Sequence, residues 1–296
     1  MRMKRLLQIS GFAIAMACAG LSVAKSVVVG GKGFTEQLII NEITRQALEA
    51  HDFDVDARTG MGSVVLRQAQ ENGQIDLYWE YTGTSLITYN KIEEPLNPQE
   101  TYDTVKELDA EKGLVWLEPS KANNTYALAM RRTDAQEKEI NSISDLADYI
   151  NDGNTISFAT NAEFAGRPDG LRPMQEIYGF EFGRPNIKRM TAGLTYQALK
   201  DEQVDLSLVF STDGRIPAFD FYVLHDNKDF FPSYALTPVV RQDTLETYPE
   251  LEEILNDLSA LLDDEVMAQL NAQVDVEKKT AREVAQQFLA EHEREV

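Results

Sequence analysis

The sequence predicts an α/β fold, and two observations support this prediction. Short runs rich in β-branched and aromatic residues alternate with stretches of helical periodicity from residue 26 almost to the C-terminus. Apolar residues make up 43% of the 296 residues, which is typical of a globular protein with a sizeable core. We therefore expect sheets that are flanked by helices.

Residues 1–24 have the pattern of a secretory signal peptide. Three basic residues, Arg2, Lys4 and Arg5, precede an apolar run that ends in small residues up to Ala24. Polar residues and glycines interrupt this run, whereas a membrane anchor needs about 20 uninterrupted apolar residues. Cleavage after Ala24 predicts a periplasmic protein. Lipid attachment at Cys18 is the minor alternative, because alanine stands three residues before it where lipoprotein signals usually have leucine.

Cysteine content and charge exclude several classes of function. Cys18 is the only cysteine, so the chain after the signal peptide has no disulfide, thiol nucleophile or cysteine metal site. The net charge is −21, and the first 24 residues contribute basic groups but no acidic ones. The remaining chain is therefore more acidic still, which argues against a nucleic-acid partner.

The first half of the chain after the signal peptide alternates strands and helices. Strand predictions rest on runs of β-branched and aromatic residues, and helix predictions rest on apolar residues spaced three or four apart. Strands are predicted at 26–30, 53–58, 75–81, 115–117 and 126–130, and helices at 35–51, 62–72 and 102–111.

The second half repeats this alternation and ends in helices. A short helix is predicted at 145–150, with Ser144 as its N-cap. Strands are predicted at 156–160, 187–190, 206–210, 221–224 and 234–241, and helices at 171–178, 194–202 and through most of 251–293.

Five short blocks occur in a fixed order along the chain. They are Lys32–Gln37 (KGFTEQ), Asp76–Thr84 (DLYWEYTGT), Asn123–Ala127 (NNTYA), Phe210–Ile216 (FSTDGRI) and Phe230–Tyr234 (FFPSY). Together they resemble the glycine betaine/choline/carnitine-binding proteins of osmoprotectant ABC transporters. The similarity extends along nearly the whole chain after the signal peptide, and the joint order and spacing of the blocks make it specific.

This resemblance implies a two-lobe periplasmic-binding-protein fold of the second type, a Venus flytrap with its ligand in the cleft between the lobes. It implies a first lobe formed by residues 25–129 and 236–296 and a second lobe formed by residues 130–235. It also implies a monomer that binds a small quaternary-ammonium ligand, uses no cofactor or metal, and delivers the ligand to an ABC permease in the inner membrane.

The resemblance further implies an aromatic cage made by Tyr81, Tyr126, Phe210 and Tyr234. Phe210 departs from the tyrosine that is usual at its position. A trimethylammonium group has no N–H to donate, so a protein holds it with aromatic faces, each worth about 0.5–2 kcal/mol. Trp79 lies on the same face of the predicted strand as Tyr81 but is expected to pack in the core.

The polar end of the ligand is assigned by the same resemblance to Lys32, Thr84 and Arg167. A lysine, a hydroxyl and an arginine can bind a carboxylate through charge-assisted hydrogen bonds. Gln37 and Asn124 are additional polar candidates. No catalytic residue is assigned.

Each of these residues also has a structural interpretation when taken alone. Tyr81 suits the core of a lobe, and Arg167 can pair with Asp169 or Glu163 on a loop. Asp213 suits a turn in which its side chain accepts backbone hydrogen bonds. Only the joint pattern of blocks favours a ligand site over these interpretations.

Two other functional classes are weighed against the quaternary-ammonium interpretation. One is a two-lobe receptor for an amino acid or another small polar solute, which would hold an α-ammonium with carboxylates instead of rings. The other is a secreted enzyme. The enzyme has less support, because His51, His225 and His292 lie far apart in sequence and no hydrolase, zinc-protease or P-loop motif occurs.

Overall fold

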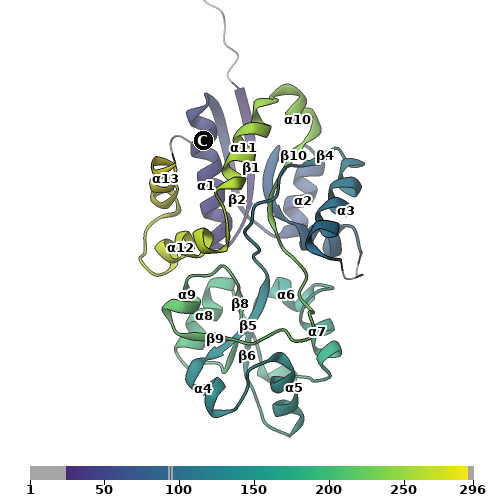
Figure 1. Ribbon diagram of the computed structural model, residues 1–296, viewed down its shortest axis with the longest axis vertical. Coiled ribbons are helices and arrows are strands. Elements are labelled where there is room, and N and C mark those ends of the chain that lie inside the picture. Colours follow the sequence, from purple (N-terminus) through teal and green to yellow (C-terminus); the bar gives the residue numbers. More distant parts are fainter. Residues whose placement is uncertain (1–24, 93, 95, 293–296) are drawn as a thin grey trace, which may run out of the picture.

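The computed structural model describes residues 25–92, 94 and 96–292. The predicted signal peptide, residues 1–24 with Cys18, lies outside the described residues. The described chain forms two α/β lobes stacked along the long axis of the molecule (Figure 1). No helix among the described residues is long and apolar enough to cross a membrane.

The first lobe is built on a five-stranded mixed sheet. Strand β1 is parallel to its neighbours β2 and β3, and β10 is antiparallel to β3 and β4. In sheet order the strands are β2 (Phe53–Met61), β1 (Lys25–Lys32), β3 (Leu77–Tyr81), β10 (Leu236–Arg241) and β4 (Leu114–Trp116).

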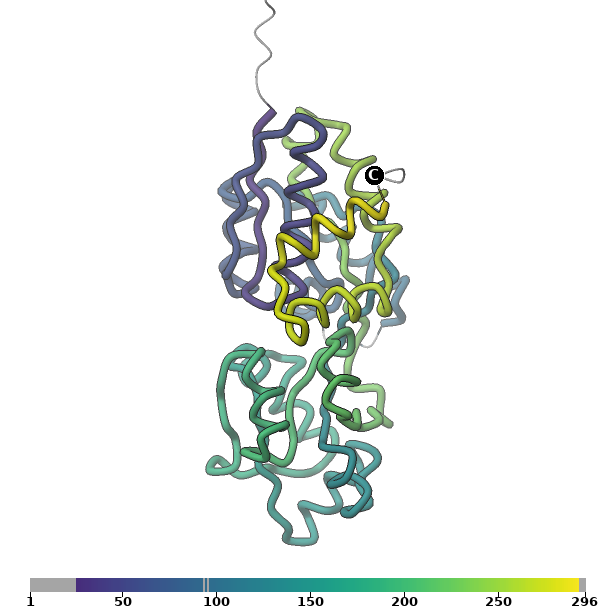
Figure 2. Tube along the Cα trace, turned by 90° about the vertical axis from the view of Figure 1, so that its left-hand side faces the viewer, coloured from purple at the N-terminus to yellow at the C-terminus, as the bar shows by residue number. Residues whose placement is uncertain are grey.

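Helices from both ends of the chain cover this sheet. Figure 2 shows the C-terminal helices, in yellow, running back over the lobe that the N-terminal strand begins. The helices of the first lobe are α1 (Thr35–Ala50), α2 (Ser63–Glu71), α3 (Pro98–Ala110), α10 (Gln242–Thr247), α11 (Glu250–Ala260), α12 (Asp264–Asp275) and α13 (Ala281–Glu291), with a π-helical segment at Thr84–Tyr89.

The second lobe contains another five-stranded sheet. Strand β8 is parallel to β6 and antiparallel to β5. In sheet order the strands are β7 (Ile187–Arg189), β6 (Phe158–Thr160), β8 (Leu206–Phe210), β5 (Tyr126–Arg131) and β9 (Phe221–Val223). The helices are α4 (Arg132–Glu137), α5 (Ile143–Asn151), α6 (Ala162–Gly166), α7 (Leu171–Tyr178), α8 (Ala192–Lys200) and α9 (Arg215–Ala218), with a 3₁₀ turn at Arg184–Asn186.

Two segments, 117–125 and 224–235, connect the lobes (Figure 1). They run antiparallel where Asn123 pairs with Ala235 in an isolated β-bridge. Segments of this kind can bend as a hinge between lobes that close on a ligand. The predicted α/β fold with two lobes is therefore confirmed.

Most predicted elements match the observed ones to within a few residues, but the predicted cap of α5 is wrong. Ser142, and not Ser144, caps this helix: its hydroxyl accepts a hydrogen bond from the Asp145 amide, and the Asp145 carboxylate accepts one from the Ser142 amide. The helix begins two residues earlier than predicted because Ile143, in its first turn, is fully buried.

One glycine fixes how closely the second connecting segment approaches the first lobe. A Cβ atom on Gly83 would lie 2.6 Å from the Ser233 carbonyl oxygen and 2.9 Å from the Tyr234 ring. Real Cβ atoms do not approach backbone oxygens so closely, so the segment carrying Tyr234 must shift if Gly83 gains a side chain.

We predict that Gly83→Ala lowers the free energy of unfolding by about 1–3 kcal/mol, because the added methyl group overpacks this contact. Urea denaturation measures the change. Gly62→Ala is the matched control, since a Cβ atom there meets nothing within 4 Å. Equal stability of the two variants would show that the connecting segment yields without strain.

Candidate functional site

A cavity of about 550 Å³ lies between the two lobes beside the connecting segments. Eight of the nine side chains predicted from the sequence line it, and they come from the first lobe, the connecting segments and the second lobe. They are Lys32, Tyr81, Thr84, Asn124, Tyr126, Arg167, Phe210 and Tyr234.

Gln37 is the predicted residue that does not reach this cavity. Its side chain is buried and supports the wall from behind. The amide nitrogen donates to the Trp79 carbonyl at 3.0 Å and to the Tyr81 hydroxyl at 3.2 Å, and the amide oxygen accepts from the Lys32 backbone at 3.2 Å. Gln37 therefore orients two lining residues without lining the cavity.

A larger cavity of about 730 Å³ shares Tyr126 with the first one. Its walls are mainly apolar, from residues such as Leu86 and Phe231, and neither Lys32 nor Arg167 contributes to it. A site that holds a small charged solute needs convergent polar groups as well as apolar surface. The smaller cavity between the lobes is therefore the better candidate.

Aromatic rings form a continuous wall on one side of the interlobe cavity. Tyr126 lies at its centre, with ring centroids 5.3 Å from Phe210 and 5.6 Å from Tyr234. Phe34 extends the wall, since it stacks on Phe210 at 5.3 Å and lies 6.2 Å from Tyr81. The structure thus brings the four predicted cage residues together with a fifth ring.

The position of Tyr81 follows from its strand and from two polar partners. Its hydroxyl donates to Oε1 of Glu36 at 2.8 Å and accepts from Gln37. Burial raises the pKa of Tyr81 well above its usual value, and the nearby Glu36 carboxylate raises it further. The phenol therefore stays neutral and presents a fixed ring to the cavity.

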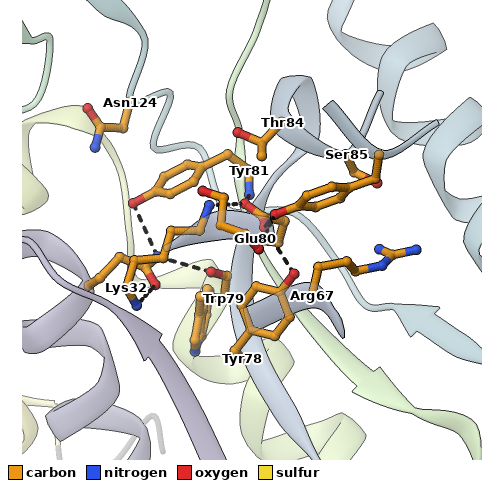
Figure 3. A network of polar contacts seen from close by, with 12 residues as sticks. Lys32, Arg67, Tyr78, Trp79, Glu80, Tyr81, Thr84, Ser85 and Asn124 are labelled. Carbon is orange, nitrogen blue, oxygen red and sulfur yellow. Dashed lines mark hydrogen bonds and ion pairs between the residues drawn. The ribbon is translucent and has the colours of Figure 1, made fainter. Parts of the chain in front are cut away.

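Lys32 is held at the edge of the cavity by a buried ion pair with Glu80, which Figure 3 shows at close range. The Lys32 Nζ atom lies 2.5 Å from Oε1 of Glu80 and 4.9 Å from the centre of the Tyr81 ring. The other oxygen of Glu80 accepts hydrogen bonds from the hydroxyls of Tyr78 and Tyr89 at 3.0 and 2.8 Å. The charge of Lys32 is thus paired and its direction is fixed.

Arg167 both pairs with Asp169 and lines the cavity. Its Nε and Nη2 atoms donate to the two oxygens of Asp169 at 2.7 and 2.6 Å. The Nη1 atom points across the cleft and lies 3.4 Å from the Thr84 hydroxyl of the first lobe. The guanidinium carbon lies 5.5 Å from the Tyr126 ring centre and 5.8 Å from that of Tyr234.

Asp169 also accepts a hydrogen bond from the Tyr234 hydroxyl. One carboxylate therefore orients a cation and a ring of the same cavity. On the first lobe, Glu80 has the corresponding arrangement, since it holds Lys32 and accepts a hydrogen bond from the Tyr81 backbone amide at 2.7 Å.

This geometry can be compared with known proteins. Residues 25–291 match the OpuAC family, described as the substrate-binding domain of ABC-type glycine betaine transport systems. The chain belongs to this family. The resemblance inferred from the five sequence blocks is therefore confirmed.

Two relatives are similar to this chain over most of its length. A glycine-betaine-binding protein of Pseudomonas aeruginosa is 48% identical over 290 residues, which cover 94% of this chain and 93% of that protein. The glycine betaine-binding protein YehZ of Escherichia coli is 34% identical, with 91% of each chain covered.

Solved structures show the same fold. The ligand-free structure of Escherichia coli YehZ has a TM-score of 0.66 at 33% identity and covers 91% of this chain and 99% of its own. A glycine betaine/carnitine/choline ABC transporter structure has a TM-score of 0.73 at 28% identity and covers 92% and 99%.

Several lining residues of this family member were not predicted from its sequence. Phe34, Met61, Ser63, Asn161 and Glu163 line the cavity. Phe34 lies inside the first block, which was a signal for it. The other four lie at the end of β2, at the start of α2 and in or next to α6, where no distinctive pattern marks them. The Ser63 hydroxyl donates to Oε1 of Glu163 at 2.5 Å and so links the two lobes at the cleft.

Two other residues have the structural roles expected for them. Trp79 is buried in the first lobe, and its indole nitrogen donates to the Thr44 hydroxyl at 2.8 Å. Asp213 accepts a hydrogen bond from the Arg215 amide at 2.9 Å and stabilises a turn.

We predict that Glu80→Ala lowers the free energy of unfolding by about 3–5 kcal/mol, because it leaves the Lys32 ammonium buried without its partner. Adding Lys32→Met removes the unpaired charge and should recover part of the loss. Chemical denaturation of the single and double variants checks both statements. The control is Glu107→Ala on an exposed helix face, and a Glu80→Ala effect no larger than this control would contradict the ion-pair argument.

Proposed function

We propose that this protein is the periplasmic substrate-binding subunit of an ABC importer and that it binds a small quaternary-ammonium osmolyte, such as glycine betaine or choline, between its lobes. The observation that carries the proposal is the continuous wall of five aromatic rings beside two oriented cations in one interlobe cavity. The names of the relatives, which include glycine betaine- and carnitine-binding proteins, support it.

The aromatic wall would hold the ammonium end of the ligand. A trimethylammonium group presents only methyl groups, so it gains from the negative faces of Tyr81, Tyr126, Phe210 and Tyr234 and needs no hydrogen-bond acceptor. Phe210 retains a ring face but offers no hydroxyl, and its stacking on Phe34 keeps that face in place.

The two cations beside the aromatic wall would hold the carboxylate end of the ligand. Arg167 uses Nε and Nη2 on Asp169, while its Nη1 contacts of 3.4 Å to Thr84 and Glu163 are longer than the usual 2.9 Å or so. The Nη1 protons are therefore available to a ligand. Lys32 and Thr84 lie on the facing wall, so a carboxylate would draw donors from both lobes together.

Such a ligand favours the closed form, because it contacts both lobes at once. The closed form would then dock on a permease in the inner membrane, whose ATPase drives import. We propose that the protein acts as a monomer without a cofactor and reaches the periplasm by way of the signal peptide at residues 1–24.

An amino-acid receptor is less well supported by this cavity. An α-ammonium group donates hydrogen bonds and needs free acceptors near the aromatic wall. The buried carboxylates that contact the wall are already engaged. Glu36 accepts hydrogen bonds from Tyr81, Asn124, Thr212 and Asn271, and Asp169 accepts them from Arg167 and Tyr234. A methylated ammonium has no such need.

The first test is isothermal titration of the mature protein with glycine betaine, choline, carnitine and proline betaine, with unmethylated glycine as the control. We expect the methylated ligands to bind and glycine not to bind, because only methylated ammonium groups suit rings without acceptors. Binding of glycine alone would favour the amino-acid receptor.

We also predict that Tyr126→Ala weakens binding of the best ligand at least tenfold, or about 1.4 kcal/mol, since it removes the central ring. Tyr126→Phe keeps the ring face and removes only the hydroxyl, so it should bind within about threefold of the unmodified protein, a difference of about 0.6 kcal/mol. Titration of both variants, with circular dichroism as a folding check, gives the comparison. If Tyr126→Ala bound the ligand as tightly as Tyr126→Phe and the unmodified protein, Tyr126 would not be part of the cage.

A further inference from the structure

A small polar cavity of about 190 Å³ adjoins the ligand cavity and shares the stacked rings of Phe34 and Phe210 with it. Its polar walls come from α1, a connecting segment, the loop after β8, the start of α9 and α12. They include Glu36, Asn124, Thr212, Asp213, Arg215 and Asn271. The ligand proposed above does not use this space.

Glu36 is a deeply buried carboxylate of this cavity, with 2% of its surface exposed. Its carboxylate accepts hydrogen bonds from the Tyr81 hydroxyl at 2.8 Å, the Asn124 amide at 2.8 Å, the Thr212 hydroxyl at 2.5 Å and the Asn271 amide at 3.3 Å. None of these donors is a cation. A buried carboxylate held only by neutral donors keeps a large desolvation penalty.

Two amide groups that bind this carboxylate through their nitrogens also line the cavity, and each has an oxygen without a donor. Oδ1 of Asn124 and Oδ1 of Asn271 are buried and receive no hydrogen bond from the described residues. The two amide groups cannot simply be turned over, because the nitrogen of each already donates to Glu36 and that of Asn271 also donates to the Thr212 carbonyl at 3.0 Å. Both unpaired atoms are acceptors, and buried acceptors need a partner.

The local charge is also negative. Arg215 pairs with Asp213 through a contact of 2.6 Å and lies 3.1 Å from Asp275, whose Oδ2 atom still receives no hydrogen bond. The exposed ammonium group of Lys278 donates a hydrogen bond of 2.6 Å to the backbone carbonyl of Asp275. With Glu36 and Asp275 ionised, three carboxylates stand against these two cations, and one further positive charge would balance the group and offset the burial that raises the pKa of both residues.

We propose that this polar cavity binds a small monovalent cation, Na⁺ or K⁺, through the amide oxygens of Asn124 and Asn271, with Glu36 supplying the compensating charge. Hard cations prefer oxygen ligands. A divalent ion would require carboxylate oxygens with free lone pairs, and both Glu36 oxygens are already saturated by donors. Within the described chain, no group of three His, Cys, Asp or Glu residues is arranged to hold a metal ion.

The cation site would be complete only when the lobes are closed. Asn124 belongs to a connecting segment and Asn271 to α12 of the first lobe, whereas Thr212, which holds both Glu36 and Asn271, belongs to the second lobe. A cation bound there stabilises the closed form, so it should raise the affinity for the osmolyte, and the osmolyte should raise the affinity for the cation. This coupling rests on the proposed function, whereas cation binding itself does not.

The direct test uses the mature protein and ²³Na NMR, which detects bound sodium by line broadening. We expect saturable broadening that K⁺ displaces and that Asn271→Ala abolishes. A second variant, Asn124→Ala, covers the case in which Asn271→Ala does not fold. The matched control is Gln269→Ala, which removes an exposed amide from the same helix. Equal broadening in all variants would overturn the site. Absent broadening would overturn it as a sodium site, and absent broadening together with equal glycine betaine affinity in KCl and N-methylglucamine chloride would overturn it altogether.

The coupled test measures glycine betaine affinity in NaCl, KCl and N-methylglucamine chloride at equal ionic strength. We expect at least threefold tighter binding with Na⁺ or K⁺ than with N-methylglucamine, and loss of this difference in Asn271→Ala. In the competing arrangement, Glu36 is protonated and donates a hydrogen bond to a reoriented amide. The glycine betaine affinity would then vary with pH but not with the cation, and that result would also overturn the proposal. Betaine binding that persists unchanged without either ion would leave the proposed function intact.

Discussion

The ion pair between Lys32 and Glu80 joins the cleft ends of two neighbouring strands, β1 and β3. Two buried charges are costly unless each finds further partners, and here Tyr78, Tyr89 and the Tyr81 amide complete the coordination of Glu80. Because the same carboxylate binds the lysine and the backbone of Tyr81, it fixes a cation and a ring relative to each other. The first-lobe wall of the cavity depends on this arrangement.

The second-lobe wall of the cavity also depends on one carboxylate that fixes both a cation and a ring. Asp169 binds Arg167 with two hydrogen bonds and also accepts one from Tyr234. Each wall therefore carries a cation whose charge is already compensated and whose direction is set before a ligand arrives. Such preorganisation reduces the side-chain entropy that binding must overcome, and it leaves only the remaining N–H groups to recognise the solute.

The sequence allowed the fold class and most of the cavity to be predicted, because the residues concerned lie in ordered blocks. It did not reveal that Phe34 joins the aromatic wall, since this depends on stacking with Phe210 across the two lobes. Nor did it show that Gln37 lies behind the wall, because a buried amide and a lining amide have the same local pattern. The predicted cap at Ser144 is wrong because the local pattern does not show that Ile143 is buried, which places the first turn of the helix after Ser142.

The ion pairs that build the two cavity walls each lie within one lobe, whereas other contacts bridge the lobes. Ser63 to Glu163, Glu36 to Thr212, Phe34 to Phe210 and the ion pair of Arg215 with Asp275 connect the lobes. Opening the cleft would break these bridging contacts and leave the wall ion pairs Lys32–Glu80 and Arg167–Asp169 whole. The lobes can therefore move as rigid bodies about the two connecting segments, and Tyr126 and Tyr234, which lie where those segments enter the cavity, would carry the hinge motion directly into the aromatic wall.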